Sequence, residues 1–426
     1  MKIAIAGYGL EGESNYRYYA ADSANEIVIV DQRQPDNPIP DGVKSIIAEN
    51  AFENLEGFDL VIRTAGLAPY KIKTDGKIWS AANEFFSKCP APIIGVTGSK
   101  GKGTTASLIA SILEAASRKV WLIGNIGVAP LDVLKEISST DIVVYELSSF
   151  QLWDIEYSPQ TAVILFIEQE HLDVHLDMDD YLNAKDRITH YQTTNDLLIY
   201  NQLNPFTRAI AARSKANKIG YPDSNSAHVK DGSFFYGEQY ICSVEAMQLM
   251  GLHNQDNACA AIDAAWSYTN DTEAIEKGLR DFKGLPHRLK FVRELDGVRY
   301  FDDSIATIPG ASIAALRSFN QPKVIILGGS SKGSDFAELA KELVKQDVRA
   351  ILIGSEAENI AHACQAAGFS AYEILEKATA PKIVERARSL ATPGSVVLLS
   401  PACASFGLFK NYSDRGDQYI AAVEAL

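Results

Sequence analysis

Short apolar runs recur along the whole chain, and each is followed by a polar or glycine-rich turn. Most of these turns lead into stretches whose apolar residues recur at helical spacing. Alternating buried strands and helices predict an α/β fold with mostly parallel sheets. The clearest runs are residues 2–6, 26–30, 60–63, 92–94, 120–123, 142–145, 162–167, 298–301, 324–327, 350–353 and 395–399.

The pattern is interrupted twice, which indicates domain boundaries. Paired prolines in Cys89-Pro-Ala-Pro92 break regular structure, and Gly284-Leu-Pro-His287-Arg288 forms a second break. A chain of 426 residues is also too long for one ordinary domain. We predict three domains. They are a Rossmann-like domain at 1–89, a central P-loop ATPase-like domain at 90–286 and a Rossmann-like domain at 287–426.

The strongest local motif is Gly95-Val-Thr-Gly98-Ser-Lys-Gly101-Lys102-Gly-Thr104-Thr105, between an apolar run and a helical pattern. Glycines let backbone N–H groups turn toward an anion, and the helix N-terminus adds partial positive charge. Lys102 would reach the terminal phosphates, although Gly103 replaces the hydroxyl residue of the common motif. A glycine turn without nucleotide is the alternative. The predicted nucleotide-binding residues are Gly98, Ser99, Lys100, Gly101, Lys102, Gly103 and Thr104.

Acidic and imidazole side chains follow two later strands. Glu146 ends an apolar run, where a P-loop protein holds a metal, although a solvated strand end is the alternative. The segment Glu168-Gln-Glu170-His171-Leu-Asp173-Val-His175 suits Mg²⁺ or Mn²⁺. It lacks the glutamate and the cysteines of the usual zinc motifs, which argues against zinc. On composition alone, Lys185 is a surface lysine.

Polar residues at other strand and helix ends predict further ligand contacts. Gly7-Tyr-Gly9-Leu-Glu-Gly12 and the acidic Asp31 resemble a dinucleotide-binding unit, and Thr64-Ala-Gly66 follows the next strand. A Rossmann-like domain without a ligand of its own is the alternative. Asn254 and Asn257 share one helix face, where they contact a base or ribose or simply cap the helix.

Composition narrows the class of protein. The chain is 46% hydrophobic and 22% charged, which is typical of globular proteins. Its net charge of −14 argues against general binding to nucleic acid or anionic membranes. We expect no signal peptide, no membrane span and a cytoplasmic location. The five scattered cysteines are expected to be free thiols.

Taken in order, the motifs resemble the Mur ligase family of peptidoglycan synthesis over essentially the whole chain. Two of them, ELSSFQL and SPACAS, are typical of its glutamate-adding branch. The motifs are TGSKGKGTT, GNIG, ELSSFQL, EHLD, YLNAK, HNQDNA, GLPHR, DDSIAT, GGSSKGSDF and SPACASFGLFKNYSDRG.

The resemblance implies an ATP-dependent ligase that adds D-glutamate to UDP-N-acetylmuramoyl-L-alanine through an acyl phosphate. It further implies two Mg²⁺ ions, small-molecule substrates, a carbamylated Lys185 and a monomer. The first domain would hold the UDP group, the second ATP and Mg²⁺, and the third the incoming glutamate.

The resemblance also assigns roles to individual residues. The catalytic set is Lys102, Glu146, His171 and Lys185. The metal set is Thr104, Glu146, His171 and Lys185. Beyond the phosphate loop, ATP contacts fall on Asn254, Asn257, Arg288 and Asp303. The residues implied to bind the UDP-linked acceptor are Gly9, Leu10, Asp31, Arg33, Thr64, Gly66, Asn125, Ser148 and Gln151. The residues implied to bind glutamate are Thr307, Lys332, Ser405, Phe406 and Tyr412.

The sequence departs from the family pattern at three places. Gly103 removes a metal-binding hydroxyl, so Thr104 would have to supply it. Thr64-Ala65-Gly66 stands where Ser-Pro-Gly is typical. Ile305 stands where typical D-glutamate ligases carry a lysine, so a ligase for L-glutamate is an alternative. A folate-type polyglutamate ligase and a catalytically silent nucleotide-binding scaffold are further alternatives.

Overall fold

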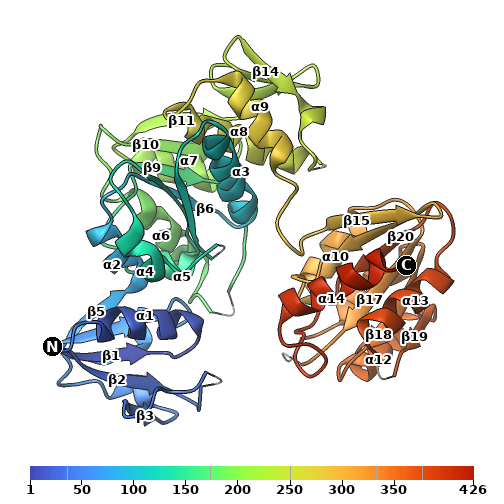
Figure 1. Cartoon of the computed structure of the whole chain (residues 1–426), viewed down its shortest axis with the longest axis horizontal. Helices are drawn as coiled ribbons and strands as arrows, with labels where there is room; N and C mark the ends of the chain where they lie inside the picture. The colour runs from blue at the N-terminus through green and yellow to red at the C-terminus, as the bar shows by residue number, and fades with distance from the viewer. Residues whose placement is uncertain (36, 126, 173, 250, 332–333, 377) are drawn as a thin grey trace. The chain divides into compact units, whose positions relative to one another are not determined.

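The computed structural model describes residues 1–426 except 36, 126, 173, 250, 332, 333 and 377. The chain forms two compact units, Met1–Lys283 and Gly284–Leu426. Both combine helices with mostly parallel sheets, which confirms the predicted α/β class (Figure 1). The proposed boundary at residue 89, inside the first unit, stays a prediction.

The first sheet has the strand order β3-β2-β1-β4-β5, and all of its strand pairs are parallel. Helix α1 packs on β1 and β2, and α2 packs on β5. The elements are β1 (Lys2–Ala6), α1 (Leu10–Ala20), β2 (Glu26–Asp31), β3 (Lys44–Ile47), β4 (Leu60–Arg63), β5 (Lys77–Ser80) and α2 (Ala81–Lys88).

The second sheet is also parallel, with the order β11-β10-β9-β6-β8-β7. Its strands are β6 (Ile93–Thr97), β7 (Val120–Gly124), β8 (Ile142–Glu146), β9 (Thr161–Ile164), β10 (Leu197–Asn201) and β11 (Asn217–Tyr221). Its helices are α3 (Lys102–Ala115), α4 (Pro130–Val133), α5 (Ser149–Leu152), α6 (Met178–Asp186), α7 (Pro205–Arg213), α8 (Leu252–Trp266) and α9 (Thr272–Asp281).

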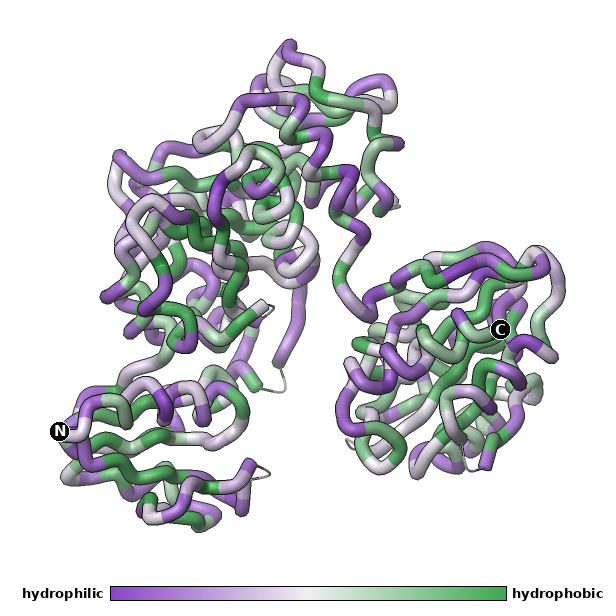
Figure 2. The backbone as a smooth tube through the Cα atoms, in the orientation of Figure 1, coloured by the Kyte–Doolittle hydropathy of each residue, from purple (hydrophilic) through white to green (hydrophobic). Residues whose placement is uncertain are grey.

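Successive strand residues of this second sheet face two different cores, as the period of two requires. Val144 contributes to a core with helices α3, α8 and α9. Val143 and Tyr145 contribute to the opposite core. The strands and inward helix faces are the most hydrophobic parts of the backbone trace (Figure 2).

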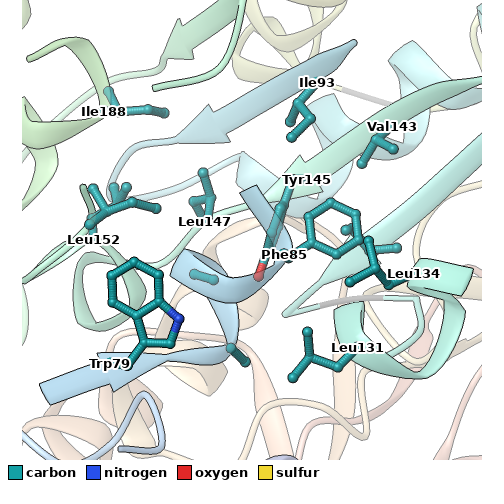
Figure 3. Close-up of a cluster of buried hydrophobic side chains, with 14 of the residues drawn as sticks. Trp79, Phe85, Ile93, Leu131, Leu134, Val143, Tyr145, Leu147, Leu152 and Ile188 are labelled. Carbon is teal, nitrogen blue, oxygen red and sulfur yellow. The ribbon is translucent and has the colours of Figure 1, made fainter. Parts of the chain in front are cut away.

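That opposite core runs without a break into the first sheet. It contains Ile3 and Ile62 of the first sheet, Phe85 of α2, and Tyr145 of β8. The rings of Phe85 and Tyr145 meet edge to face, with centroids 5.6 Å apart, and Figure 3 shows the surrounding side chains. Residues 1–89 and the second sheet therefore share one hydrophobic core.

A small antiparallel sheet, β12-β13-β14, completes the first unit and packs on α8. Its strands are β12 (Ala227–Lys230), β13 (Ser233–Tyr236) and β14 (Gln239–Ser243).

The second unit contains one sheet with the order β15-β16-β20-β17-β18-β19, parallel except for the pair β15–β16. One core lies under α10, α11 and α12, and the other lies under α13 and α14. Its strands are β15 (Lys290–Leu295), β16 (Val298–Asp302), β17 (Lys323–Gly328), β18 (Val348–Ile353), β19 (Tyr372–Ile374) and β20 (Val396–Leu399). Its helices are α10 (Pro309–Arg317), α11 (Ala337–Val344), α12 (Ala357–Ala367), α13 (Ala380–Leu390) and α14 (Tyr412–Glu424).

Candidate active site

The phosphate loop connects β6, a central strand of the second sheet, to α3. Gly101 precedes the helix with a φ of 87°, a conformation that favours glycine. A Cβ atom there would lie 2.4 Å from Oδ1 of Asn257, so the loop packs directly on α8. The backbone therefore requires glycine at this position both for its conformation and for space.

Parallel strands bring several candidate residues to the same edge of this sheet. Because β6 lies between β8 and β9, the phosphate loop lies between the segments that follow those two strands. Glu146 is the last residue of β8 and is 4% exposed. The backbone N–H of Asn125, beyond β7, donates to Glu146 O at 3.4 Å.

Two candidate lysines donate to the same carbonyl of the phosphate loop. Gly98 O lies 3.0 Å from Nζ of Lys102 and 2.7 Å from Nζ of Lys185. Lys185 is buried, which excludes a surface lysine. Burial lowers the pKa of its amine well below the ordinary value, and repulsion from Lys102 lowers it further against the opposing effect of Glu170. This environment favours a neutral amine.

Ser99 ties the loop to the segment after β9 and to α6. Its hydroxyl donates to Glu168 O at 2.9 Å and lies 2.7 Å from the hydroxyl of Tyr181. The Tyr181 ring in turn lies 4.6 Å from Nζ of Lys185. The Ser99 side chain therefore holds the loop in place through hydrogen bonds within the protein. Tyr181 adjoins both Ser99 and Lys185, and the sequence analysis did not identify it as a site residue.

The chemistry of this edge fits a nucleotide with Mg²⁺. Within the described part of the chain, no three His, Cys, Asp or Glu side chains gather as a ready-made metal cluster. Mg²⁺ is commonly held by one or two carboxylates together with phosphate oxygens and water, which suits a single buried Glu146. Thr104 is 8% exposed, and the buried Oγ1 of Thr105 has no hydrogen-bond partner among the described residues. Either hydroxyl offers an oxygen in place of the one missing at Gly103.

His171 and His175 differ sharply in their surroundings. The His171 side chain is 41% exposed, and its backbone has a φ of 58°. His175 is buried, and its Nδ1 lies 2.7 Å from Oδ2 of Asp180 while its Nε2 lies 2.9 Å from Oγ of Ser149. Burial lowers the pKa of the His175 imidazole, partly offset by Asp180. A neutral ring that donates to Asp180 and accepts from Ser149 fits these contacts.

The His175 network is absent from the sequence prediction. It joins the His171-bearing segment to α5, just beyond Glu146. Its only sequence signal was the presence of both histidines in the segment 168–175, which suits Mg²⁺ or Mn²⁺. Hydrogen bonding to Asp180 and Ser149 gives His175 a positioning role instead.

Ser148 and Gln151 cap α5. The Gln151 Oε1 accepts from Ser148 N at 2.9 Å, and the Ser148 Oγ accepts from Gln151 N at 3.2 Å. This reciprocal capping box fixes the chain direction immediately after Glu146.

Among the UDP candidates, several meet at the edge of the first sheet. Asp31 accepts from the backbone N–H of Tyr8 at 2.8 Å, which fixes the turn that leads to Gly9. Thr64 packs so closely on Gly7 that a Cβ there would lie 2.4 Å from its Oγ1. The other candidates, Leu10, Arg33 and Gly66, are exposed.

The asparagines of α8 adjoin the phosphate loop. Nδ2 of Asn257 donates to Oδ1 of Asn254 at 3.2 Å, while Asn257 also packs on Gly101. The N-cap of α8 is Gly251, so both asparagines lie within the first two turns of the helix.

In the second unit, Arg415 holds together the loops that carry the glutamate candidates. It is 1% exposed and donates to Ser304 O at 2.7 Å and to Cys403 O at 3.1 Å. The Ser304 hydroxyl donates to Tyr412 O at 2.7 Å. Thr307 is half-buried, Ser405 is buried, and Phe406 and Tyr412 are exposed. Lys332 lies outside the described residues.

Two ATP candidates also lie in the second unit. Asp303 accepts from the Ser400 hydroxyl at 2.6 Å and from Leu289 N at 3.1 Å. Burial raises the pKa of the Asp303 carboxyl to about 7, against the opposing effects of these hydrogen bonds and of Arg288. Arg288 itself is exposed.

Models of known families match most of the chain. The Mur ligase middle domain matches residues 96–265, and the Mur ligase, glutamate ligase domain matches residues 287–403. The first match contains the motifs from TGSKGKGTT to HNQDNA, and the second contains DDSIAT and GGSSKGSDF.

Two relatives illustrate the similarity of sequence. A protein of Clostridium tetani named UDP-N-acetylmuramoylalanine–D-glutamate ligase is 36% identical over 400 residues, covering 90% of this chain and 87% of the relative. A protein of the same name from Caldanaerobacter subterraneus is 33% identical over 441 residues, covering 99% and 98%.

Solved structures share the fold at lower identity. MurC of Thermotoga maritima superposes with a TM-score of 0.60 at 16% identity, covering 100% of this chain and 99% of that one. MurF of the same organism, solved with ADP, gives 0.57 at 19% identity, covering 99% and 93%. A folylpolyglutamate synthase of Mycobacterium tuberculosis also gives 0.57, at 15% identity, but covers only 76% of this chain and 92% of its own.

Proposed function

The chain belongs to the Mur ligase family of ATP-dependent ligases in peptidoglycan synthesis, and we propose that it joins D-glutamate to UDP-N-acetylmuramoyl-L-alanine. The observation that carries this proposal is the 36% identity to a relative named for that reaction, over 90% of the chain. The partial coverage by the folylpolyglutamate synthase favours a Mur-type substrate over a folate.

We propose that the first step occurs beside the phosphate loop. The terminal carboxylate of the acceptor attacks the γ-phosphorus of ATP, forming an acyl phosphate and releasing ADP. The Lys102 ammonium, held over the loop by the carbonyl groups of Gly98 and Ser99, would stabilise the charge on the transferring phosphoryl group.

Lys185 would act as an anion after carbamylation. Its neutral amine attacks CO₂ and loses a proton, which converts an uncharged group beside Lys102 into an anion of opposite charge to the Lys102 ammonium. The lowered pKa of Lys185 supports this assignment, because only the unprotonated amine reacts.

Mg²⁺ would be held by Glu146, the Lys185 carbamate, His171 and a hydroxyl from Thr104, together with phosphate oxygens. The ion neutralises phosphate charge when bound. His175 would keep the His171 segment in position through Asp180 and Ser149.

In the second step the amine of glutamate attacks the acyl carbon. A tetrahedral intermediate collapses to the amide, and phosphate leaves. We assign glutamate recognition to Thr307, Ser405, Phe406, Tyr412 and Lys332. The support for this assignment is the packing of two of their loops around one buried residue, Arg415.

One observation favours L-glutamate as a second candidate. Ile305 provides an apolar side chain in the DDSIAT segment, and its backbone N–H donates to His287 O at 3.1 Å. An isoleucine offers no charge to a substrate carboxylate, so enantiomer choice would depend on the remaining glutamate residues.

The acyl-phosphate step can be tested without glutamate. With ATP, Mg²⁺, acceptor and hydroxylamine, we expect ADP release and a hydroxamate of the acceptor. Omitting the acceptor should abolish both products. ATP binding without phosphate or ADP release under any substrate combination would instead identify a silent scaffold.

A further inference from the structure

Arg63 is the only residue of β4 with a charged side chain, and it is completely buried. It lies at the end of that strand and is 0% exposed. Buried arginines require partners for their donors. The sequence pattern included Arg63 only as the last residue of an apolar run.

The Arg63 guanidinium divides its donors between two segments that are distant in sequence. Nη1 lies 3.3 Å from the carbonyl oxygens of both Thr64 and Leu67. Nε donates to Asp154 Oδ2 at 2.7 Å, Nη2 donates to the other Asp154 oxygen, and Nη2 lies 3.0 Å from Phe150 O. The planar guanidinium group of Arg63 therefore forms hydrogen bonds to both segments.

Each of these two segments carries residues that are predicted to contact the UDP-linked acceptor substrate. The first is the loop 64–67, whose Ala65 N–H is also held by the Glu11 carboxylate at 2.8 Å. The second, residues 150–154, follows Glu146 and the Ser148–Gln151 cap directly. Phe150 also contacts the ring of His171, with centroids 4.9 Å apart.

We propose that Arg63 is a positioning residue that sets the spacing between the loop holding the UDP end of the acceptor and the segment beside its reacting carboxylate. The inference rests on the proposed function and adds to it a residue without substrate contact. A rigid bidentate fork transmits position better than apolar packing, because its hydrogen bonds are directional. Asn83 reinforces the second segment through Asp154 O, at 3.0 Å.

Steady-state kinetics separate positioning from stability. Arg63→Lys keeps the charge but loses the fork, and we expect kcat/KM for the acceptor to fall about 100-fold. The KM for ATP should stay within about twofold of wild type. The matched control is Lys77→Met, because Lys77 and Glu156 bridge the same two regions at 3.1 Å on the exposed surface. Its kinetics should be unchanged.

A double variant distinguishes a loss of positioning from a loss of stability. Arg63→Met with Asp154→Leu replaces the buried ion pair by apolar packing, which should restore the melting temperature. The proposal expects kcat/KM for the acceptor to remain low in this variant. Recovery of kcat/KM together with stability would overturn it.

Hydrogen exchange with UDP as the probe tests the coupling without turnover. In the wild type, UDP should slow exchange in both 64–67 and 148–155. In Arg63→Lys it should slow only the first segment. Equal slowing of both segments in that variant, or no slowing in the wild type, would overturn the inference. The expected exchange pattern without any ligase turnover would support the coupling and refute the proposed reaction.

Discussion

At the scale of single residues, two lysine side chains donate to one carbonyl oxygen. Nζ of Lys102 and Nζ of Lys185 both lie within hydrogen-bond distance of Gly98 O. Burial lowers the pKa of the Lys185 amine, and repulsion from Lys102 lowers it further, which favours the reactive neutral form. Carbamylation would relieve this repulsion.

Lys185→Ala should lower kcat by about 100-fold or more, by removing the anion that supports the metal site. Acetate or propionate should restore part of the activity by occupying the vacated space. The control is Lys218→Ala, an exposed lysine of β11 that should leave kcat unchanged. Full activity of Lys185→Ala would contradict the carbamate assignment.

A second residue-scale prediction concerns Asp263, buried on α8. Its Oδ1 accepts from Ala227 N at 2.8 Å, and burial raises the pKa of its carboxyl to about 8. The folded state therefore binds this proton more tightly than the unfolded chain. The stability that this group contributes is complete below about pH 4 and is lost as the pH rises toward 8.

Asp263→Asn keeps an acceptor for Ala227 but cannot ionise. The loss of unfolding free energy between pH 5 and pH 8 should be smaller than in wild type by at least about 1.4 kcal/mol, the equivalent of one pKa unit. Urea unfolding at the two pH values measures this difference. The exposed Asp281→Asn variant should keep the wild-type dependence, and an unchanged dependence in Asp263→Asn would refute the prediction.

At the scale of elements, the phosphate loop was the part of the site most visible in the sequence. Its glycines, its lysine and the flanking strand and helix are contiguous, so local rules identify them. Arg63, Asp154 and Tyr181 were not predicted as site residues, and His175 was predicted only as part of a segment that suits Mg²⁺ or Mn²⁺. Their roles arise from contacts between segments far apart in sequence, which no local pattern encodes. For the same reason the local pattern indicated a surface lysine at Lys185, and only the family resemblance implied a site role for it. In the fold Lys185 is buried and donates to Gly98 O.

Gly101→Ala tests the phosphate loop at a position where an added Cβ atom has no space. The added Cβ would collide with Asn257 in a backbone conformation that already disfavours alanine. We expect ATP affinity to fall at least about tenfold, since the clash displaces the loop. Gly57→Ala is the matched control, because Gly57 has a φ of 78° but open space around it. It should lose stability only, by about 1–2 kcal/mol. Equal ATP affinity in both variants, measured by calorimetry, would contradict this account.

At the scale of the whole molecule, the alternation of strands and helices predicted the α/β class, because buried parallel strands are apolar throughout. The shared core of the first unit was not predicted. The prolines near residue 90 indicated a hinge, whereas Phe85 and Tyr145 pack together across that position. Local chain breaks say little about the side-chain packing on either side of them.

Phe85→Ala should therefore destabilise both sheets of the first unit together. We expect a loss of about 3–5 kcal/mol and faster hydrogen exchange in β1 and β8 alike, because Phe85 is fully buried in the core that contains residues of both strands. Exchange in β17 of the second unit should not change. Phe206→Ala, at an exposed position of α7, should alter stability by less than about 0.5 kcal/mol. Protection retained in either sheet would argue against a shared core.

A ligase assay with both enantiomers of glutamate tests the proposed reaction. Purified protein is supplied with ATP, Mg²⁺ and UDP-N-acetylmuramoyl-L-alanine, and phosphate release is followed in parallel with D-glutamate and with L-glutamate. We expect phosphate release and a UDP-linked dipeptide with the D-enantiomer, and neither product when the acceptor is omitted. Turnover with L-glutamate and none with D-glutamate would contradict it.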